Sequence, residues 1–294
     1  MILVTGVSGA LGGLVLDRLN AVADLDVVAG TRAATAAARR IDFDDPTTLV
    51  DGFTDVRVLV FVSAGYAEDD VVLARHGAVV DAAATAGVRH VIYTSLAGSG
   101  DQLSIALAHR WTEARLAEAP FDVTVLRNGL YAEIPAGLAT SSAESAAATG
   151  LFTAPLGHGR VAVVAREDLA DITARVAVET QSDLAAGRRS RHAGCTYELA
   201  GTTAVGGEDI AGALAEVLGR PVTYQPVSLT QAREALAGLE PYQVSHTLSL
   251  FANIGAGLLE SPGDDLAALL PTSPRPALDL ISDALKAVVP VPTV

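Results

Sequence analysis

The sequence predicts an α/β fold, a doubly wound parallel sheet of the Rossmann type with a smaller C-terminal α/β substrate lobe. Three observations predict it: apolar runs alternate with Ala-rich stretches in the first half, a glycine-rich turn follows the first run, and the alternation loosens after about Gly129. Runs that are apolar throughout indicate strands of a sheet covered on both faces, and helices between them impose parallel crossovers.

The predicted elements follow this alternation along the chain. Strands are expected at Ile2–Val4, Val27–Ala29, Val56–Val62, His90–Tyr93 and Val123–Leu126, and crossover helices at Ala74–Ala86 and Ala106–Glu118. Later in the chain, strands are expected at Val161–Val164, Tyr197–Ala200 and Val222–Tyr224, and helices from Glu167 and over Glu208–Leu218. The stretch between Tyr131 and Gly159, rich in Ala, Ser and Gly, is expected to be an excursion from the sheet.

The glycine-rich turn predicts a dinucleotide site. The first strand is followed by Thr5-Gly6-Val7-Ser8-Gly9-Ala10-Leu11-Gly12 and then by a helical pattern. Gly6 permits the tight turn, Gly9 lets backbone N–H groups approach a pyrophosphate, and Gly12 allows the helix to pack closely on the strand. The alternative is an ordinary glycine-rich turn. The predicted cofactor contacts here are Gly6, Ser8, Gly9, Ala10, Leu11 and Gly12.

The end of the second strand favours NADP over NAD. It reads Ala29-Gly30-Thr31-Arg32, at the point where an NAD enzyme places a carboxylate on the adenosine ribose. The guanidinium of Arg32 can hold a 2′-phosphate with charge-assisted hydrogen bonds, whereas a carboxylate would repel it. A solvated loop arginine is the alternative. The predicted cofactor is therefore NADPH or NADP+.

The three-residue spacing of the first two glycines resembles the extended short-chain dehydrogenase/reductase superfamily and its atypical members. The resemblance implies that Asp42 and Phe43, at the end of the third strand, contact adenine, and that Val62, Ser63 and Ala64 end the fourth strand beside the nicotinamide ribose. Phe43 could equally be a core residue under a helix that begins near Pro46.

The catalytic pair of a typical short-chain reductase is absent. Such enzymes pair a tyrosine with a lysine four residues later, whereas the one lysine of this chain is Lys286. His109 and Glu113 occupy the tyrosine and lysine spacings, and Ser95 is the part that is retained. Since His109 and Glu113 lie one helical turn apart, the carboxylate could orient the imidazole and raise its pKa, giving a proton-transfer pair. A surface pair without a catalytic role is the alternative.

A wider set of residues resembles the NmrA-like atypical short-chain dehydrogenase/reductase group, most closely its NAD(P)H:quinone oxidoreductase type 2 and triphenylmethane reductase branch. These residues are Tyr93–Leu96, the helix that carries His109, Thr112-Glu113, Leu126–Glu133, Gly159–Ala162, Arg166–Ala170, Tyr197–Gly201 and Pro221–Tyr224. The resemblance implies that NADPH lies in the main domain, with contacts from Thr94, Asn128, Gly129 and Leu130. It also implies that Tyr131 lines the pocket of a quinone-like or dye-like acceptor.

The expected domain organisation combines the motifs with the resemblance. Residues 1–130 are expected to form the NADP-binding Rossmann domain, with residues 159–180 returning to it. Residues 131–158 and 195–294 are expected to form mainly the substrate-binding lobe and the C-terminal helices.

Three functions are consistent with these residues. The first is an NADPH-dependent reductase that transfers hydride to a quinone-like or other conjugated acceptor, in which proximity to the nicotinamide supplies most of the acceleration. The second is a non-catalytic NADP-binding redox sensor of the NmrA type. The third is an enone or carbonyl reductase in which His109 donates the proton.

The composition excludes several other classes. A formal net charge of −14 with one lysine opposes binding to phosphate backbones, so nucleic acid is not an expected partner. Cys195 is alone, which rules out an intrachain disulfide and shows no metal-binding pattern. No apolar run approaches the ~20 residues of a membrane span, and no basic leader begins the sequence. We expect a cytoplasmic monomer or homodimer that acts on a small-molecule acceptor, without a membrane or metal.

Overall fold

The computed structural model describes residues 1–33, 35, 37–64 and 67–289. Within these residues the chain divides into two compact units, each assembled from separate segments. Of the described residues, the first unit contains those of Met1–Leu96, Ile105–Asn128 and Glu167–Glu198, and the second contains Ala97–Ser104, Gly129–Arg166 and those from Leu199 onward.

The first unit is built on a sheet that confirms the predicted doubly wound topology. Its strands, in the part of the chain that the structure describes, are β1 (Ile2–Val4), β2 (Val27–Thr31), β3 (Ala38–Arg40), β4 (Val58–Phe61), β5 (His90–Leu96), β6 (Asp122–Asn128) and β10 (Thr196–Leu199). Their order is β10-β6-β5-β4-β1-β2-β3, and the pairs from β3 across to β6 are parallel. Because the strand order reverses at β1, the carboxyl ends of β1 and β4 flank the crevice in which such sheets bind ligands.

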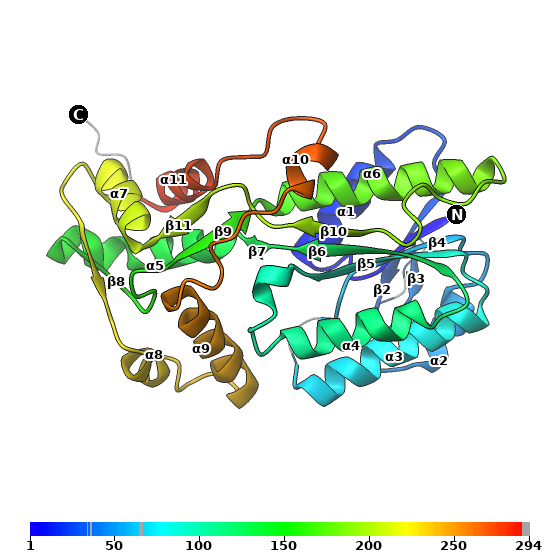
Figure 1. The fold of residues 1–294 in the computed structure, drawn as a ribbon, viewed down its shortest axis with the longest axis horizontal. Helices are drawn as coiled ribbons and strands as arrows, with labels where there is room; N and C mark the ends of the chain where they lie inside the picture. Colours follow the sequence, from blue (N-terminus) through cyan, green and yellow to red (C-terminus); the bar gives the residue numbers. More distant parts are fainter. Residues whose placement is uncertain (34, 36, 65–66, 290–294) are drawn as a thin grey trace. The chain divides into compact units, whose positions relative to one another are not determined.

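Helices cover both faces of this sheet. They are α1 (Ala10–Asn20), α2 (Thr47–Gly52), α3 (Asp69–Thr85), α4 (Ala106–Ala117) and α6 (Arg166–Ala185). Figure 1 shows α2, α3 and α4 on one face and α1 and α6 on the other. Arg18 of α1 donates to Asp171 of α6 at 2.8 Å, which ties the second pair together. Coverage of both faces explains why every residue of β4 and β5 is buried.

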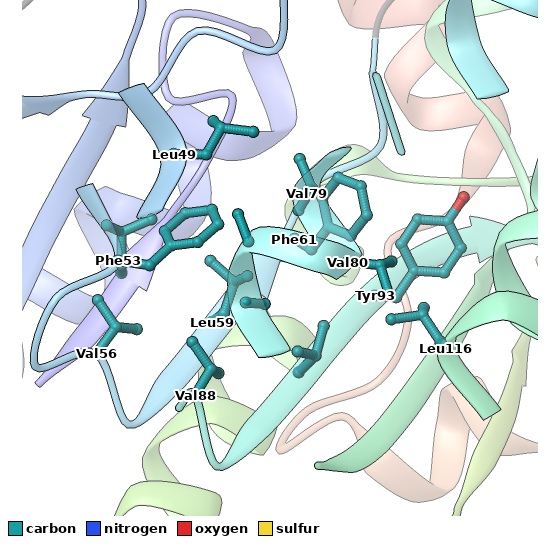
Figure 2. Close-up of a cluster of buried hydrophobic side chains, with 14 of the residues drawn as sticks. Leu49, Phe53, Val56, Leu59, Phe61, Val79, Val80, Val88, Tyr93 and Leu116 are labelled. Atoms are coloured by element: carbon teal, nitrogen blue, oxygen red, sulfur yellow. The ribbon is translucent and has the colours of Figure 1, made fainter. Parts of the chain in front are cut away.

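The core of the first unit lies between the sheet and α2, α3 and α4 (Figure 2). Large side chains come from each layer, including Phe53 after α2, Phe61 of β4, Val79 of α3 and Tyr93 of β5. Phe61 and Tyr93 pack with their ring centroids 5.1 Å apart. The Tyr93 hydroxyl is a polar group within this core, and it lies within hydrogen-bond distance of His109.

Several predicted elements differ from the structure. The fourth strand ends at Phe61, so Val62–Ala64 follow it rather than end it. The third strand ends at Arg40, so Asp42 and Phe43 follow it, which corrects the expected strand end. Helix α3 begins at Asp69 rather than at Ala74, because acidic residues suit the first turn of a helix. The segment between Tyr131 and Gly159 contains the helix α5 (Glu133–Thr149), which was not predicted from its Ala-rich and Ser-rich sequence. Its buried face consists of small side chains, which give a weak hydrophobic pattern.

The second unit holds two small groups of strands. Among the described residues, β9 (Arg160–Val164) lies between β7 (Leu130–Tyr131), to which it is parallel, and β11 (Ala204–Gly206), to which it is antiparallel. The strands β8 (Leu151–Ala154) and β12 (Thr223–Pro226) form a parallel pair. The remaining elements are η1 (Gly98–Gly100), α7 (Gly207–Leu218), α8 (Leu229–Ala235), α9 (Pro241–Gly255), α10 (Asp265–Leu269) and α11 (Ala277–Val288). Helices α5, α7 and α11 pack together. None of the helices described has the length and apolar character needed to cross a bilayer.

Candidate functional site

The turn between β1 and α1 leaves the first turn of that helix open. Gly6 has a φ of +65°, a conformation that favours glycine, and Gly9 N–H donates to the Gly6 carbonyl at 2.9 Å. A Cβ added at Gly12 would lie 2.3 Å from the Gly6 oxygen, so only glycine lets the helix start so close to the strand. Gly9 caps the helix without any side chain, and Ser8, Gly9 and Ala10 are exposed. The free N–H groups of this turn fit a pyrophosphate.

Leu11 and Gly12 differ from the exposed residues of the turn because both are buried. They would therefore support a bound cofactor through packing and backbone groups rather than through exposed side chains.

Arg32 lies directly after β2 and is exposed. Arg75 holds the carboxylate of Asp44 with two hydrogen bonds of 2.7 and 2.9 Å. These bonds lower the pKa of Asp44, and the positive charge of Arg32 lowers it further. Because Arg75 already pairs with Asp44, the guanidinium of Arg32 keeps its capacity to bind an added anion such as a 2′-phosphate.

A pocket of about 330 Å³ opens between the loop after β3 and helix α3. It is lined by Phe43, Asp44, Pro46, Asp70, Val71, Ala74 and Arg75. Phe43 is half-buried and also contacts the core, with its ring edge-on to Phe61 at 5.8 Å between centroids. Phe43 therefore contacts the core and also lines the pocket, whose apolar and planar walls suit a purine. Asp42 is half-buried and does not line this pocket.

The segment Val62–Ala64 follows β4 and contacts the glycine turn. A Cβ added at Gly6 would lie 3.3 Å from the Cβ of Val62. The N–H groups of Val62, Ser63 and Ala64 donate to Thr5 Oγ1, Thr94 Oγ1 and His76 Nε2 at 3.0, 3.0 and 2.9 Å. The structure therefore brings together the predicted residues Gly6, Val62, Ser63, Ala64 and Thr94 at the carboxyl edge of the sheet.

Ser95 belongs to a charged network. Its hydroxyl donates to Glu113 at 2.5 Å, and Arg110 donates to the Ser95 oxygen at 3.3 Å. Glu113 also accepts from Arg110 at 2.7 Å and from Arg127 through both carboxylate oxygens. Burial opposes ionisation of Glu113, but hydrogen bonds from Arg127 and Ser95 and the charges of both arginines lower its pKa. Because its hydrogen is directed to Glu113, Ser95 can meet a ligand only as an acceptor while that bond persists.

His109 has a different partner from the one expected. Its Nδ1 lies 2.9 Å from the hydroxyl of Tyr93, whereas Glu113 is held by Ser95, Arg110 and Arg127. Burial and the charge of Arg110 lower the pKa of His109 to about 4, and the opposing effect of Glu113 is smaller. The expected increase in this pKa is therefore wrong, because desolvation outweighs the nearby carboxylate.

Tyr93 and His109 are both uncharged at neutral pH. Burial raises the pKa of the Tyr93 phenol far above its ordinary range, so the hydroxyl keeps its hydrogen and can donate it to His109 Nδ1. With the bond in that direction, the hydrogen of the neutral imidazole is on Nε2. His109 therefore presents an N–H donor rather than an imidazolium.

The residues after β5 and β6 divide between the units. Asn128 ends β6 in the first unit, and its Oδ1 is buried with no hydrogen-bond partner among the described residues. In the second unit, Gly129 is buried, and a Cβ added there would lie 2.7 Å from Ala200 Cα. Leu130 and Tyr131 are half-buried in β7. The guanidinium of Arg166 lies over the Tyr131 ring, 4.8 Å from its centroid. The orphaned acceptor of Asn128 fits a carboxamide N–H group.

Several residues of this site were missed by the sequence analysis, namely Thr5, Arg75, His76, Tyr93, Arg110 and Arg127. A usable signal exists for His76, because it shares a buried helical stripe with Val79, Val80 and Ala83 and is the polar member of that stripe. No comparable signal marks Arg110 or Arg127. In the described part of the chain, no group of three or more His, Cys, Asp or Glu side chains is placed to hold a metal ion.

Comparison with known proteins places the chain among oxidoreductases. It is 33% identical to quinone oxidoreductase 2 of Escherichia coli strain K12 over 247 residues, which cover 80% of this chain and 81% of the relative. It is 29% identical to an NmrA-like family domain-containing oxidoreductase of Aspergillus flavus, with coverage of 96% and 94%. No family model matches the chain.

A solved structure agrees with these relatives. The triphenylmethane reductase of Citrobacter sp., crystallised in complex with NADP(H), superimposes with a TM-score of 0.83 at 28% identity, covering 98% of this chain and 99% of that one. The resemblance inferred from the motifs is thereby confirmed. The chain belongs to the NmrA-like atypical short-chain dehydrogenase/reductases, in the branch of quinone oxidoreductase type 2 and triphenylmethane reductase.

Proposed function

We propose that this protein is an NADPH-dependent reductase that transfers hydride to a quinone-like acceptor or to a conjugated acceptor such as a dye. The observation that carries the proposal is the open first turn of α1 above Gly6, Gly9 and Gly12, a cradle built for a pyrophosphate. The names of the relatives support the chemistry, since they include a quinone oxidoreductase and a triphenylmethane reductase seen with NADP(H).

The residues that would hold the cofactor lie along the carboxyl edge of the sheet in the first unit. The N–H groups at the start of α1 would bind the pyrophosphate, Arg32 the 2′-phosphate, and the pocket beside Phe43 the adenine. Val62–Ala64 and Thr94 would support the nicotinamide ribose, and Asn128 Oδ1 would accept from the carboxamide. When bound, the reduced nicotinamide supplies the hydride.

The protonation state of the site favours acceptors that need no acid. His109 is neutral at pH 7, because its pKa is lowered to about 4, and a neutral imidazole is a poor proton donor. The Ser95 hydrogen is committed to Glu113. Reduction of a simple carbonyl requires a proton on its oxygen as the hydride arrives, whereas a reduced quinone can take its proton from water. This contrast supports quinones and dyes over the carbonyl-reductase alternative, although the Nε2–H of His109 could still donate a hydrogen bond to an acceptor oxygen.

The test is turnover of NADPH by the purified protein with a panel of quinones, triphenylmethane dyes, enones and simple ketones, followed by loss of nicotinamide absorbance. We expect turnover with quinones or dyes and little with ketones. Tight NADPH binding without turnover of any acceptor would contradict the proposal and favour an NmrA-type sensor. Reduction of ketones that depends on His109 would favour the carbonyl-reductase alternative.

We also propose that the protein acts in the cytoplasm as a monomer or homodimer on a small-molecule acceptor. Fractionation of the producing cells tests the location. Size-exclusion chromatography with light scattering measures the oligomeric state.

A further inference from the structure

We propose that His76 is a positioning residue for the cofactor: it holds the backbone of Ala64 in place and so shapes the surface on which the nicotinamide ribose would rest. The inference rests on the proposed function, because it assigns a task to a residue beneath the proposed NADPH site. His76 lies on α3, is fully buried, and does not line the pocket beside Phe43.

The hydrogen bonds of His76 have only one consistent set of directions. Its Nε2 accepts the N–H of Ala64 at 2.9 Å, so Nε2 carries no hydrogen. The hydrogen is therefore on Nδ1, which donates to Thr112 Oγ1 at 2.7 Å, and Thr112 in turn donates to the Ala108 carbonyl at 2.7 Å. This chain of bonds connects the segment after β4 to the backbone of α4. Burial keeps the imidazole neutral by lowering its pKa to about 3, so its acceptor nitrogen persists at neutral pH.

Aromatic packing fixes the orientation of the His76 ring. Phe61 and Tyr93, which Figure 2 shows side by side in the core, meet the ring edge-on at centroid distances of 5.1 and 5.8 Å. A ring held on two sides and bonded at both nitrogens has one available rotamer. Its Nε2 is therefore a fixed anchor for Ala64.

The Val62–Ala64 segment is anchored at every residue. Thr5 and Thr94 hold the N–H groups of Val62 and Ser63; Thr5 directly follows β1 and Thr94 lies in β5. His76 is the anchor that comes from the helix layer, and it holds the last of the three N–H groups. Since these N–H groups are used internally, the backbone of the segment can offer a ribose hydroxyl only its carbonyl oxygens as acceptors. The position of those oxygens depends on the anchors, including His76.

The chain offers a matched control for the test. His90 is also fully buried, and its Nε2 lies 2.8 Å from Thr124 Oγ1, while Thr124 donates to the His192 carbonyl at 2.8 Å. This pair lies at the start of β5 and β6, the edge of the sheet opposite to the proposed cofactor site. Thr112→Val and Thr124→Val remove the same hydroxyl from equally buried pairs, so they should lose similar thermal stability.

The experiment compares NADPH dissociation constants, measured by nicotinamide fluorescence, for the wild type and the two valine variants. We expect Thr112→Val to weaken binding about tenfold and Thr124→Val to change it by less than about twofold, since one hydrogen bond is at stake. Thr112→Ser should restore the affinity. With a quinone acceptor, Thr112→Val should raise the KM for NADPH more than it lowers kcat.

A second comparison covers the case in which Thr112→Val does not fold. His76→Asn keeps an amide near the position of Nδ1 but has no atom at that of Nε2, whereas His76→Gln places an amide near Nε2. We expect weaker NADPH binding and faster hydrogen exchange at Ala64 for the Asn variant, with partial rescue by Gln. Exchange at Ala64 needs no cofactor.

Two results would overturn the proposal. NADPH affinity unchanged in both Thr112→Val and His76→Asn, or reduced equally in Thr124→Val, would show that His76 has no specific effect on the cofactor. If the wild type bound no NADPH, the proposed function would fail together with the role of His76. Binding that is insensitive to these variants would overturn only the role of His76.

Discussion

Two histidine–threonine pairs occupy opposite edges of the sheet in the first unit. In both, a fully buried histidine is bonded to a buried threonine, whose own hydrogen goes to a backbone carbonyl. They differ at the other ring nitrogen. His76 uses Nε2 to hold Ala64, whereas Nδ1 of His90 is buried without a partner among the described residues.

The difference shows that a buried histidine–threonine pair can have different roles at the two ends of the parallel strands. At the amino edge, where the strands begin, His90 and Thr124 connect the neighbouring strands β5 and β6, and both side chains are buried. At the carboxyl edge, His76 and Thr112 join two helices and also position a segment beside the glycine turn. Because the carboxyl ends of parallel strands carry the ligand site, the second nitrogen acquires a task only there. Changes at the carboxyl edge should therefore affect binding, and changes at the amino edge only stability.

Among the substitutions, the largest effect should come from Gly12→Ala at the carboxyl edge. The new Cβ would lie 2.3 Å from the Gly6 oxygen and 2.6 Å from the Gly6 carbonyl carbon, both backbone atoms. We expect NADPH affinity to fall more than about a hundredfold and unfolding free energy to fall by about 3 kcal/mol, because overpacked backbone must shift. Titration calorimetry and urea unfolding measure these.

Gly87→Ala is the amino-edge control for Gly12→Ala. Gly87 has a φ of +72°, and a Cβ there would meet nothing within 4 Å. We expect a cost of about 1 kcal/mol from the left-handed backbone and an unchanged NADPH dissociation constant. An equal loss of NADPH affinity in the two alanine variants would contradict the claim that only changes at the carboxyl edge affect binding.

Acid should destabilise both histidine sites alike. The folded-state pKa values of His76 and His90 are lowered to about 3 and about 4 from the ordinary value of 6.5. The unfolded chain therefore takes up protons first, so this stability is present above pH 6.5 and is lost as the pH falls toward the folded values. From pH 7 to pH 5 we expect a loss of about 2 kcal/mol for each of these histidines, and a similar loss from His109, whose pKa is also lowered to about 4, or about 6 kcal/mol together.

Urea unfolding at the two pH values measures this loss, and His90→Gln should remove roughly a third of it. The carboxylates with lowered pKa values contribute mainly below their ordinary range, which keeps the interval from pH 7 to pH 5 informative. A stability that does not change across this interval would show that these histidines are not buried in their neutral form.

Glu113→Gln tests whether the charged network at the carboxyl edge affects turnover as well as stability. Its carboxylate accepts from Ser95, Arg110 and Arg127, so the amide would leave two arginines partly unpaired. We expect a loss of about 2 kcal/mol in stability and about a tenfold loss in turnover with a quinone. Glu179→Gln is the control, because Glu179 accepts from His192 and Arg175 away from the carboxyl edge. That control should lose stability alone, as measured by thermal unfolding and steady-state kinetics.

The smallest of these effects should be that of Arg32→Ala. An exposed guanidinium that binds a 2′-phosphate should contribute about tenfold to NADPH affinity and almost nothing to NADH affinity. Arg189→Ala, which removes an exposed arginine paired with Asp122 at the amino edge, should change neither. Equal affinity of the wild type for the two cofactors, or no effect of Arg32→Ala, would remove the basis for an NADP preference.

Much of the fold could be predicted because it depends on local patterns. The strand Ile2–Val4 has the predicted bounds, and Ala106–Ala117 differs from its predicted helix by a single residue at the end. Apolar runs, helical spacing and the glycine turn act within a few residues of one another, so the sequence shows them directly. The helix Glu133–Thr149 could not be predicted in the same way, since its buried face is made of small side chains that resemble its exposed face.

The sequence by itself determined the doubly wound sheet, the family and the position of the glycine cradle. The tertiary structure decided which polar side chains meet. His109 pairs with Tyr93 rather than with Glu113, because Ser95 and Arg127 reach Glu113 from neighbouring strands. In the same way, the fold places Ala64, which follows β4, within hydrogen-bond distance of His76 on α3. Strand order and burial set such contacts and the pKa values that follow from them, and neither is a property of residues adjacent in the chain.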